Sequence, residues 1–300
     1  MSDIARLTGV LVALASPLTR EGEVDQAGVG RLIEHVIGGG VHGVLALGST
    51  GESASLDEPA RRAVLDAVVA ATEGRVPVMC GVAQSQLSTA IAEVEAAARA
   101  GADAVLVAPP FYYPTDQSGV LAFYRAVAER ASLPMLVYNI PQFTKVKAEP
   151  ATVAALAREG AIQGIKDSSR DFEYFEGVCV ATRELPAFRV FTGSDTMLVA
   201  SLAAGGAGTI CGAANVAPAW VVRVYDQFTR GDLGAARASQ DAVYKLVGAL
   251  RDGVFPLAIK AALHMEGICE PWSAPPGRRL EEPALSRLRE FLADSRLLPD

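Results

Sequence analysis

A single lysine follows a short apolar segment in the middle of the chain, and its setting suggests covalent chemistry. Residues 161–165 have the length and apolar character of a buried strand, and Lys166 would lie at its C-terminal end. Lysine is rarely buried without a partner, and burial disfavours the ammonium form and leaves an amine that can attack a carbonyl carbon. We therefore consider Lys166 a candidate Schiff-base residue. The alternative is a strand-end lysine that reaches solvent or pairs with Asp167.

The other lysines have settings that suit this chemistry less well. Lys145 and Lys147 fall in a predicted loop, and Lys245 and Lys260 fall in helical patterns. The sequence therefore predicts that only Lys166 has the surroundings of a Schiff-base lysine.

Hydroxyl groups and glycines are concentrated in residues 48–53, directly after a predicted strand. Ser49 and Thr50 lie between Gly48 and Gly51, so hydroxyl groups and backbone N–H groups could together hold a small carboxylate. The alternative is a capped turn before the next helix.

Tyrosines occur after two other predicted strands. Tyr138 ends an apolar segment and could be a proton-transfer group or a hydrogen-bonded core residue. Tyr112 and Tyr113 lie in the aromatic loop of residues 109–114, which could serve packing, a subunit interface or catalysis. These loops contain no cluster of carboxylates or histidines suited to a metal, so we expect metal-free chemistry centred on Lys166.

Eight apolar segments alternate with helical patterns along the chain. We predict strands over residues 8–15, 43–47, 76–80, 104–107, 135–138, 161–165, 188–192 and 208–211. We predict helices over residues 25–37, 57–72, 88–100, 119–130, 149–158, 171–182, 195–204 and 218–229. Such alternation indicates a parallel sheet, and eight units favour a closed (β/α)8 TIM barrel of the α/β class. The first turn lacks the glycine pattern of a dinucleotide-binding fold.

The predicted barrel leaves a C-terminal region with a helical pattern. We predict a catalytic (β/α)8 domain over residues 1–230 and a C-terminal helical appendage over residues 231–300, packed on the barrel. Its helices are expected near residues 232–250, 254–267 and 281–293. In a barrel of this kind the active site lies at the C-terminal ends of the strands, where the residues named above would meet.

The composition restricts the classes of partner. The net charge is −7 and no basic run is present, so a nucleic acid is not the expected ligand. No apolar run reaches the length of about 20 residues that spans a membrane. The 4 cysteines match no metal-binding spacing, and the chain begins without a secretory signal, which together predict a cytoplasmic protein.

Three segments together resemble the signature segments of a known enzyme family. They are residues 48–53 (GSTGES), 138–141 (YNIP) and 164–169 (GIKDSS), and residues 255–260 also fit. The chain is similar, from Leu7 to its helical tail, to the dihydrodipicolinate synthase / N-acetylneuraminate lyase family.

This resemblance implies a class I aldolase mechanism. Lys166 would form a covalent imine with pyruvate or with a 2-oxo acid that yields pyruvate, and no other cofactor is expected. Tyr138 would move protons through Ser49 to Tyr112 of a neighbouring subunit, so we expect a homodimer or a homotetramer. Ser49 and Thr50 would hold the substrate carboxylate.

The resemblance also assigns residues around the imine and at the specificity site. Gly193 and Ile210 would line the pocket, largely through backbone atoms. Phe143 occupies the position at which synthases that use aspartate semialdehyde have an arginine, and it cannot bind a carboxylate. Asp195 lies where the sugar-acid lyases use polar side chains to contact substrate hydroxyls. Ser49 resembles the lyases, because the synthases usually have threonine at this position.

These departures favour a lyase that cleaves or forms a 2-keto-3-deoxy sugar acid or a similar 2-oxo acid, with pyruvate and an aldehyde as its partners. The first alternative is 4-hydroxy-tetrahydrodipicolinate synthase, which condenses pyruvate with aspartate semialdehyde. Hydratases, dehydratases and 4-hydroxy-2-oxoglutarate aldolases would share the imine. A further alternative is a non-catalytic barrel that binds a 2-oxo acid.

Overall fold

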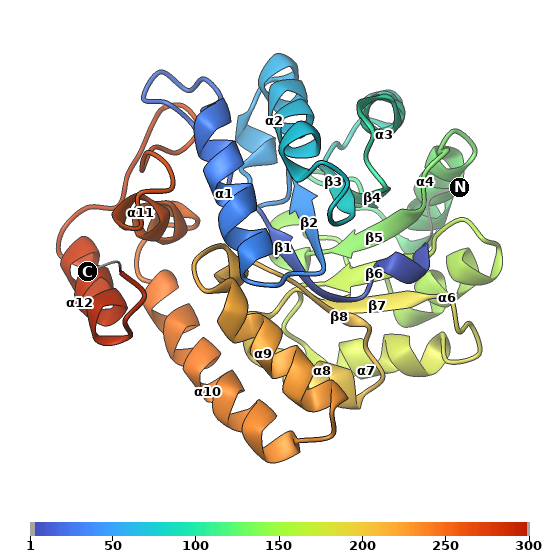
Figure 1. Cartoon of the computed structure of the whole chain (residues 1–300). Helices are drawn as coiled ribbons and strands as arrows, with labels where there is room; N and C mark the ends of the chain where they lie inside the picture. The colour runs from blue at the N-terminus through green and yellow to red at the C-terminus, as the bar shows by residue number, and fades with distance from the viewer. Residues whose placement is uncertain (1–3, 299–300) are drawn as a thin grey trace.

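The protein is a closed barrel of eight parallel strands surrounded by helices, as a computed structural model shows for residues 4–298 (Figure 1). The strands are β1 Gly9–Ala13, β2 Gly43–Ala46, β3 Val78–Val82, β4 Ala104–Val107, β5 Met135–Asn139, β6 Gly164–Asp167, β7 Arg189–Thr192 and β8 Gly208–Cys211. Each strand pairs with the next one in the chain, and β1 pairs with β8 to close the ring. The predicted (β/α)8 barrel is confirmed.

Helices connect successive strands on the outside of the barrel. They are α1 Gln26–Gly38, α2 Glu58–Thr72, α3 Leu87–Ala100, α4 Gln117–Ala128, α5 Pro141–Thr144, α6 Pro150–Arg158, α7 Phe172–Ala181, α8 Leu198–Ala203 and α9 Pro218–Thr229. Several begin at an aspartate whose carboxylate accepts a hydrogen bond from the backbone N–H three residues further on, as at Asp25, Asp57, Asp116 and Asp171. This contact satisfies an N–H group that the helix itself leaves unpaired.

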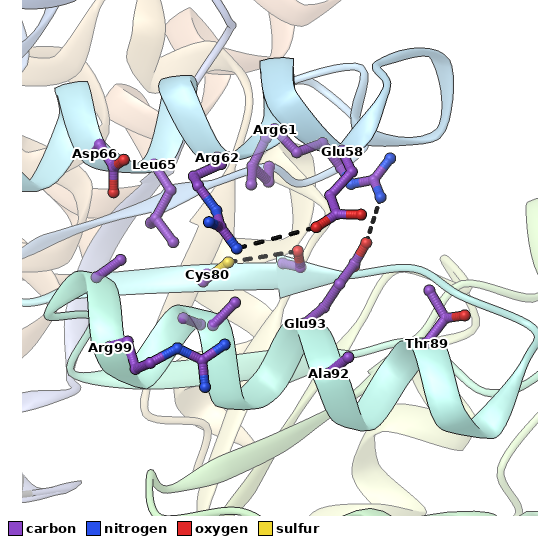
Figure 2. Close-up of a pocket in the computed structure, with 15 residues that line it drawn as sticks. Glu58, Arg61, Arg62, Leu65, Asp66, Cys80, Thr89, Ala92, Glu93 and Arg99 are labelled. Atoms are coloured by element: carbon purple, nitrogen blue, oxygen red, sulfur yellow. Dashed lines mark hydrogen bonds and ion pairs between the residues drawn. The ribbon is translucent and has the colours of Figure 1, made fainter.

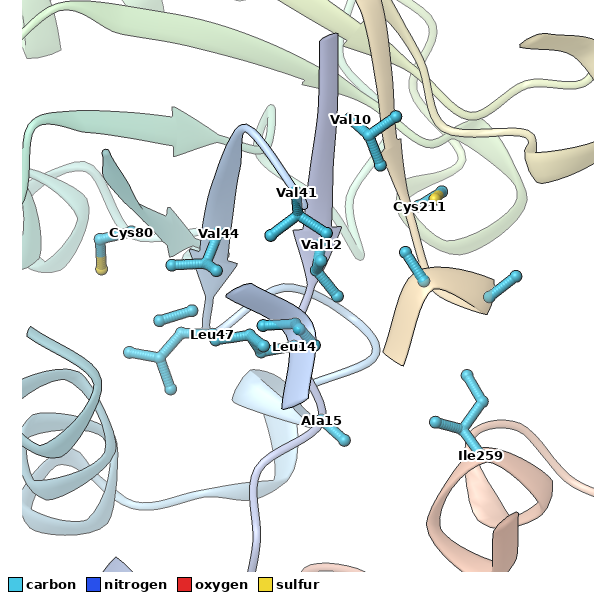
Figure 3. Close-up of a cluster of buried hydrophobic side chains, with 14 of the residues drawn as sticks. Val10, Val12, Leu14, Ala15, Val41, Val44, Leu47, Cys80, Cys211 and Ile259 are labelled. Carbon is cyan, nitrogen blue, oxygen red and sulfur yellow. The ribbon is translucent and has the colours of Figure 1, made fainter. Parts of the chain in front are cut away.

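The strands are apolar along their whole length because both of their faces are buried. In β1, Leu11 belongs to the cluster inside the barrel, which also contains Phe191 and Ile210. Its neighbours Val10 and Val12 belong to the layer between sheet and helices, part of which Figure 3 shows. This alternation directs every second side chain of a strand toward the barrel axis.

Three further helices follow the barrel: α10 Leu233–Leu250, α11 Leu257–Met265 and α12 Ala284–Asp294. α10 lies along α9, and α11 and α12 lie beyond the end of α10 that faces away from the α9–α10 turn (Figure 1). Val243 and Leu246 of α10 are buried in the same apolar cluster as the barrel's outer layer. The division of the chain into two domains between residues 230 and 231 stays a prediction. The ends of the chain, residues 1–3 and 299–300, lie outside the described residues.

The starts of β3 and β6 differ from the sequence prediction by two residues or more. β3 begins at Val78 rather than at residue 76, because Pro77 has no N–H to donate to the ladder. β6 begins at Gly164 rather than at residue 161, because the N–H of Ala161 bonds to Leu156 O and completes the end of the preceding helix. Lys166 is therefore the third residue of a four-residue strand, near its C-terminal end as expected, and Asp167 is the last residue.

Candidate active site

A cavity of about 440 Å³ opens at the C-terminal ends of the strands. Every sequence-predicted site residue except Tyr112 lines it: Ser49, Thr50, Tyr138, Phe143, Lys166, Gly193, Asp195 and Ile210. They come from β5, β6 and β8 and from the loops that follow β2, β5 and β7, so the barrel topology brings together residues that are far apart in sequence.

Lys166 is buried inside the cavity without a charged partner. Its exposed fraction is 4%, and within residues 4–298 it makes no ion pair and no side-chain hydrogen bond. The alternative of a pair with Asp167 is wrong: the Asp167 carboxylate accepts hydrogen bonds from Asn139 at 2.7 Å and from Ser169 at 3.0 Å. Adjacent strand residues face opposite sides of the sheet, which directs Asp167 away from the barrel axis. Burial raises the pKa of Asp167.

The register of the sheet places Tyr138 next to Lys166. The two residues are direct partners on β5 and β6, so both side chains point to the barrel axis. The Nζ atom of Lys166 lies 4.6 Å from the centre of the Tyr138 ring. The Tyr138 hydroxyl lies 3.2 Å from the Ser49 hydroxyl, and these groups share a hydrogen bond. The phenol and the alcohol are therefore hydrogen-bonded to each other beside the amine.

Gly193 provides the space that the Lys166 side chain occupies. A Cβ atom at this position would lie 2.9 Å from Cε of Lys166 and would overlap Oγ of Ser168. Any larger residue would therefore displace the lysine. The side chains of Lys166 and Ser168 approach the backbone at position 193 closely, which explains the glycine there.

The loop after β2 presents unpaired hydrogen-bond donors to the cavity. In the described part of the chain, the backbone N–H groups of Ser49 and Thr50 make no hydrogen bond. Neither hydroxyl caps the short 3-10 helix Ser53–Ser55 that follows, so the alternative of a simple capped turn is wrong. Two free N–H groups and two hydroxyl groups form a site that fits a carboxylate.

Tyr112 lies away from the cavity of its own chain. Its side chain is 85% exposed and packs edge-on against Tyr113, with ring centres 5.1 Å apart. Its φ of 82° is rarely adopted by a residue with a Cβ atom. The expected link from Ser49 to Tyr112 does not occur within one chain, and its formation between subunits stays a prediction.

An ion pair that sequence reasoning missed fixes the loop after β2. Lys260 of α11 is fully buried, and its Nζ atom lies 2.5 Å from Oε1 of Glu52 and 2.6 Å from the carbonyl oxygen of Trp272. The other oxygen of Glu52 accepts from the N–H of Ala274 at 2.8 Å. Lys260 lies in a helix, as its pattern predicted, but its burial and its ion pair were not predicted. A signal was present, because Glu52 and Lys260 both lie in the family-like segments.

Asp195 has a structural contact in addition to its place in the cavity. Its Oδ1 atom accepts from the N–H of Ala213 at 2.7 Å and thereby orients the loop after β8. Phe143 of α5 lies at the cavity mouth and is 58% exposed. Two arginines that the sequence analysis did not single out, Arg170 and Arg251, also line the cavity.

A second cavity, of about 350 Å³, lies outside the barrel between α2 and α3 (Figure 2). It contains the paired side chains of Arg61 and Glu93 and the thiol of Cys80. Burial raises the pKa of Cys80 to about 12, so this thiol stays protonated and is a poor nucleophile. The thiol of this cavity is therefore not a candidate nucleophile.

Two features are absent from residues 4–298. No group of three histidine, cysteine, aspartate or glutamate side chains is arranged to hold a metal ion. In the same part of the chain, no helix has the length and apolar character needed to cross a membrane.

A closed barrel with an unpaired lysine in a cavity at the strand ends is the arrangement expected of a class I aldolase, and comparison with known proteins shows which family the chain belongs to. The sequence description of the Dihydrodipicolinate synthetase family matches residues 6–294, so the chain belongs to this family. Members of the family are class I aldolases and lyases. The protein is therefore an enzyme, which excludes the alternative of a non-catalytic binding barrel.

Three similar proteins illustrate the family. An uncharacterized DapA-like lyase of Halobacterium salinarum is 36% identical, over 97% of this chain and 95% of the relative. A 4-hydroxy-tetrahydrodipicolinate synthase of Methanoculleus marisnigri is 33% identical, over 95% of this chain and 98% of the relative. The crystal structure of YagE, a prophage protein of E. coli K12 in complex with pyruvate, is 28% identical with a TM-score of 0.93, over 97% of this chain and 99% of that one.

Proposed function

We propose that this enzyme is a Schiff-base lyase that cleaves or forms a 2-oxo acid, such as a 2-keto-3-deoxy sugar acid, with pyruvate and an aldehyde as its partners. The observation that carries the proposal is the setting of Lys166, which is buried, unpaired within the described residues and in contact with a cavity. The proposed reaction needs no cofactor, because the covalent imine on Lys166 accepts the electrons of the breaking bond. The solved complex of YagE with pyruvate supports a 2-oxo acid as the ligand.

The proposed reaction begins when the Lys166 amine attacks C2 of the 2-oxo acid and water leaves, which gives a protonated imine. The C4 hydroxyl then loses its proton and the C3–C4 bond breaks. The bond electrons move into the imine, and an aldehyde departs. Protonation at C3 followed by hydrolysis releases pyruvate and restores the free amine.

The proposed proton carrier is Tyr138, which lies beside the imine position and shares a hydrogen bond with Ser49. Tyr112 of a neighbouring subunit would complete this relay, which requires at least a homodimer and is compatible with a homotetramer. Ser49 and Thr50 would bind the C1 carboxylate through the donors described above. Gly193 and Ile210 would shape the pocket around the imine.

Two residues that line the cavity, Phe143 and Asp195, support a sugar acid as the substrate. Phe143 is apolar and cannot make the paired hydrogen bonds by which an arginine binds a carboxylate. Asp195 retains one carboxylate oxygen that could accept a hydrogen bond from a substrate hydroxyl. The second candidate is 4-hydroxy-tetrahydrodipicolinate synthase, which the names of several relatives favour.

We place this activity in the cytoplasm, with neither a nucleic acid nor a membrane as partner. All 4 cysteines lie in the described part of the chain and none forms a disulfide, as expected in a reducing compartment. The net charge of −7 argues against a nucleic-acid ligand.

The test compares two substrates. Release of pyruvate from a panel of 2-keto-3-deoxy sugar acids is measured beside the condensation of pyruvate with aspartate semialdehyde. The proposal predicts the higher kcat/KM for a sugar acid, and faster turnover of the semialdehyde would overturn it. Phe143→Arg is the matched variant and should raise semialdehyde turnover by about tenfold or more, because it restores a charge-assisted contact to the carboxylate. Phe143→Leu is its control and should not.

A further inference from the structure

Two arginines without acidic partners lie in the wall of the catalytic cavity. Arg170 belongs to the loop after β6, and Arg251 follows the last residue of α10. In the described chain neither guanidinium makes an ion pair or a hydrogen bond, although Arg75 and Arg125 on the surface pair with Glu34 and Glu159. The proposed aldol chemistry does not use either arginine.

The two arginines line the same cavity, and the charge of each guanidinium group disfavours the charge of the other. Partial burial lowers the pKa of Arg251, and the charge of Arg170 lowers it further, while Asp195 acts in the opposite direction. Asp195 does not neutralise the pair, because its carboxylate lies beyond ion-pairing distance and accepts a hydrogen bond from Ala213. Both arginines are exposed to solvent at the cavity wall, and the repulsion between two like charges there is relieved when an anion binds between them.

The backbone at Arg170 is a second indication that this side chain matters. Its φ is 63°, in the left-handed region that glycine adopts without steric cost. An arginine here carries a backbone cost that a glycine would remove. Such a cost is retained most readily at a position whose side chain has a function.

The arginines lie in the same cavity as the residues that would bind the keto end of the substrate. Lys166 fixes the keto carbon, and the N–H groups of Ser49 and Thr50 fix the adjacent carboxylate. The remote end of a bound 2-oxo acid must then extend into the rest of the cavity, whose wall contains Arg170 and Arg251. A cavity of about 440 Å³ has ample space for a six-carbon acid in this direction.

We propose that Arg170 and Arg251 bind a second anionic group at the end of the substrate remote from its keto group. The preferred substrate is then a 2-oxo acid with a distal carboxylate or phosphate. This inference rests on the proposed Schiff-base function of Lys166. Cleavage would give pyruvate and an aldehyde that keeps the anionic group.

The test uses two stable six-carbon probes that differ only at the far end, 2-oxoadipate and 2-oxohexanoate. Each competes with labelled pyruvate for trapping on Lys166 by borohydride. We expect 2-oxoadipate to compete at a concentration at least tenfold lower. In the double variant Arg170→Gln/Arg251→Gln the ratio should fall to near one. Arg237→Gln is the control, because Arg237 lies on α10, is exposed and does not line the cavity.

The outcomes separate this inference from the proposed function. Equal competition by both probes, or a preference that survives in the double variant, would overturn the arginine site while pyruvate trapping on Lys166 still supports the imine. A wild-type protein that traps no pyruvate would overturn both. Trapping of pyruvate by the double variant verifies that its site is folded. Higher salt should weaken the binding of 2-oxoadipate more than that of 2-oxohexanoate, since only 2-oxoadipate has a second charge that salt can screen.

A turnover comparison identifies the anion. Pyruvate release is measured from 2-keto-3-deoxyglucarate, from 2-keto-3-deoxy-6-phosphogluconate and from 2-keto-3-deoxygluconate, whose far end is neutral. A higher kcat/KM for the first assigns the site to a carboxylate, and a higher value for the second assigns it to a phosphate. The highest value for the neutral compound would contradict the inference.

Discussion

Lys260 and Glu52 form a buried ion pair, with Nζ and Oε1 2.5 Å apart, that joins α11 to the loop after β2. The protein thus has two buried lysines with different electrostatic surroundings. Lys260 faces a carboxylate and a carbonyl oxygen, whereas Lys166 has neither partner within the described residues. The contrast explains why the two lysines serve different purposes: one holds the loop that presents Ser49 and Thr50, and the other is available to a substrate.

Breaking this pair should destabilise the fold. Lys260→Met leaves the Glu52 carboxylate buried without its cation, and we expect a loss of about 3–5 kcal/mol in the free energy of unfolding, measured by urea denaturation. The double variant Lys260→Met/Glu52→Leu removes both charges and should recover much of this loss. The exposed pair of Arg287 and Asp252 is the control, and Arg287→Gln should cost no more than about 1 kcal/mol. A Lys260→Met protein as stable as the wild type would contradict this role.

Tyr138→Phe tests proton transfer separately from imine formation. The substitution keeps the ring beside Lys166 and removes only the hydroxyl that bonds to Ser49. We expect kcat to fall by about 10²–10⁴-fold while pyruvate is still trapped on Lys166. Single-turnover kinetics with a cleavable 2-oxo acid would measure the step that slows. An unchanged kcat would show that another group moves the protons.

The proposed contribution of Tyr112 has a matched control in its neighbour. Tyr112 and Tyr113 are both exposed and pack on each other, so their phenylalanine variants should be about equally stable. Tyr112→Phe should reduce kcat at least tenfold, because it interrupts the relay between subunits, and Tyr113→Phe should not. Equal effects of the two variants on kcat would argue for a packing role instead.

Glu266 should make stability depend on pH. Burial raises its pKa from the ordinary 4.5 to about 8, and it faces His35, whose pKa burial lowers. Between pH 4.5 and about 8, the Glu266 carboxyl holds a proton in the folded state and has released it in the unfolded state. The contribution of Glu266 to the free energy of unfolding therefore falls as pH rises through this range. Glu266→Gln should remove this fall and gain on the order of 4 kcal/mol at pH 9 relative to pH 4. Thermal unfolding of each variant at several pH values in this range measures the pH dependence of stability, and Glu270→Gln, at an exposed position, is the control. An equal dependence of stability on pH in the two variants would contradict the role of Glu266.

The order of strands and helices was predictable because each unit is encoded locally, by an apolar run and a capped helix. Parallel strands end at one edge, so Tyr138 and Lys166 could be placed together from the predicted topology, whereas Gly193, Ile210, Phe143 and Asp195 were predicted only from the family resemblance. The start of β6 was missed because the backbone of Ala161 completes a helix end. The pair of Glu52 and Lys260 joins residues far apart in the chain, and only the folded structure brings them together.

The arginines of the cavity wall were missed for a related reason. Arg170 follows the family-like segment by one residue, and Arg251 lies in the C-terminal region, which was considered only for its helical pattern. An exposed arginine has no sequence signature that distinguishes a binding role from a surface role. The distinction required the cavity and the absence of acidic partners in the described chain.

The central claim is that Lys166 forms the imine, and reductive trapping tests it most directly. The protein is incubated with pyruvate and borohydride, its intact mass is measured, and the modified peptide is mapped. We predict one reduced pyruvyl adduct per chain, located on Lys166 and absent from Lys166→Met. An unmodified protein, or an adduct on Lys145 or Lys260 in place of Lys166, would contradict the account.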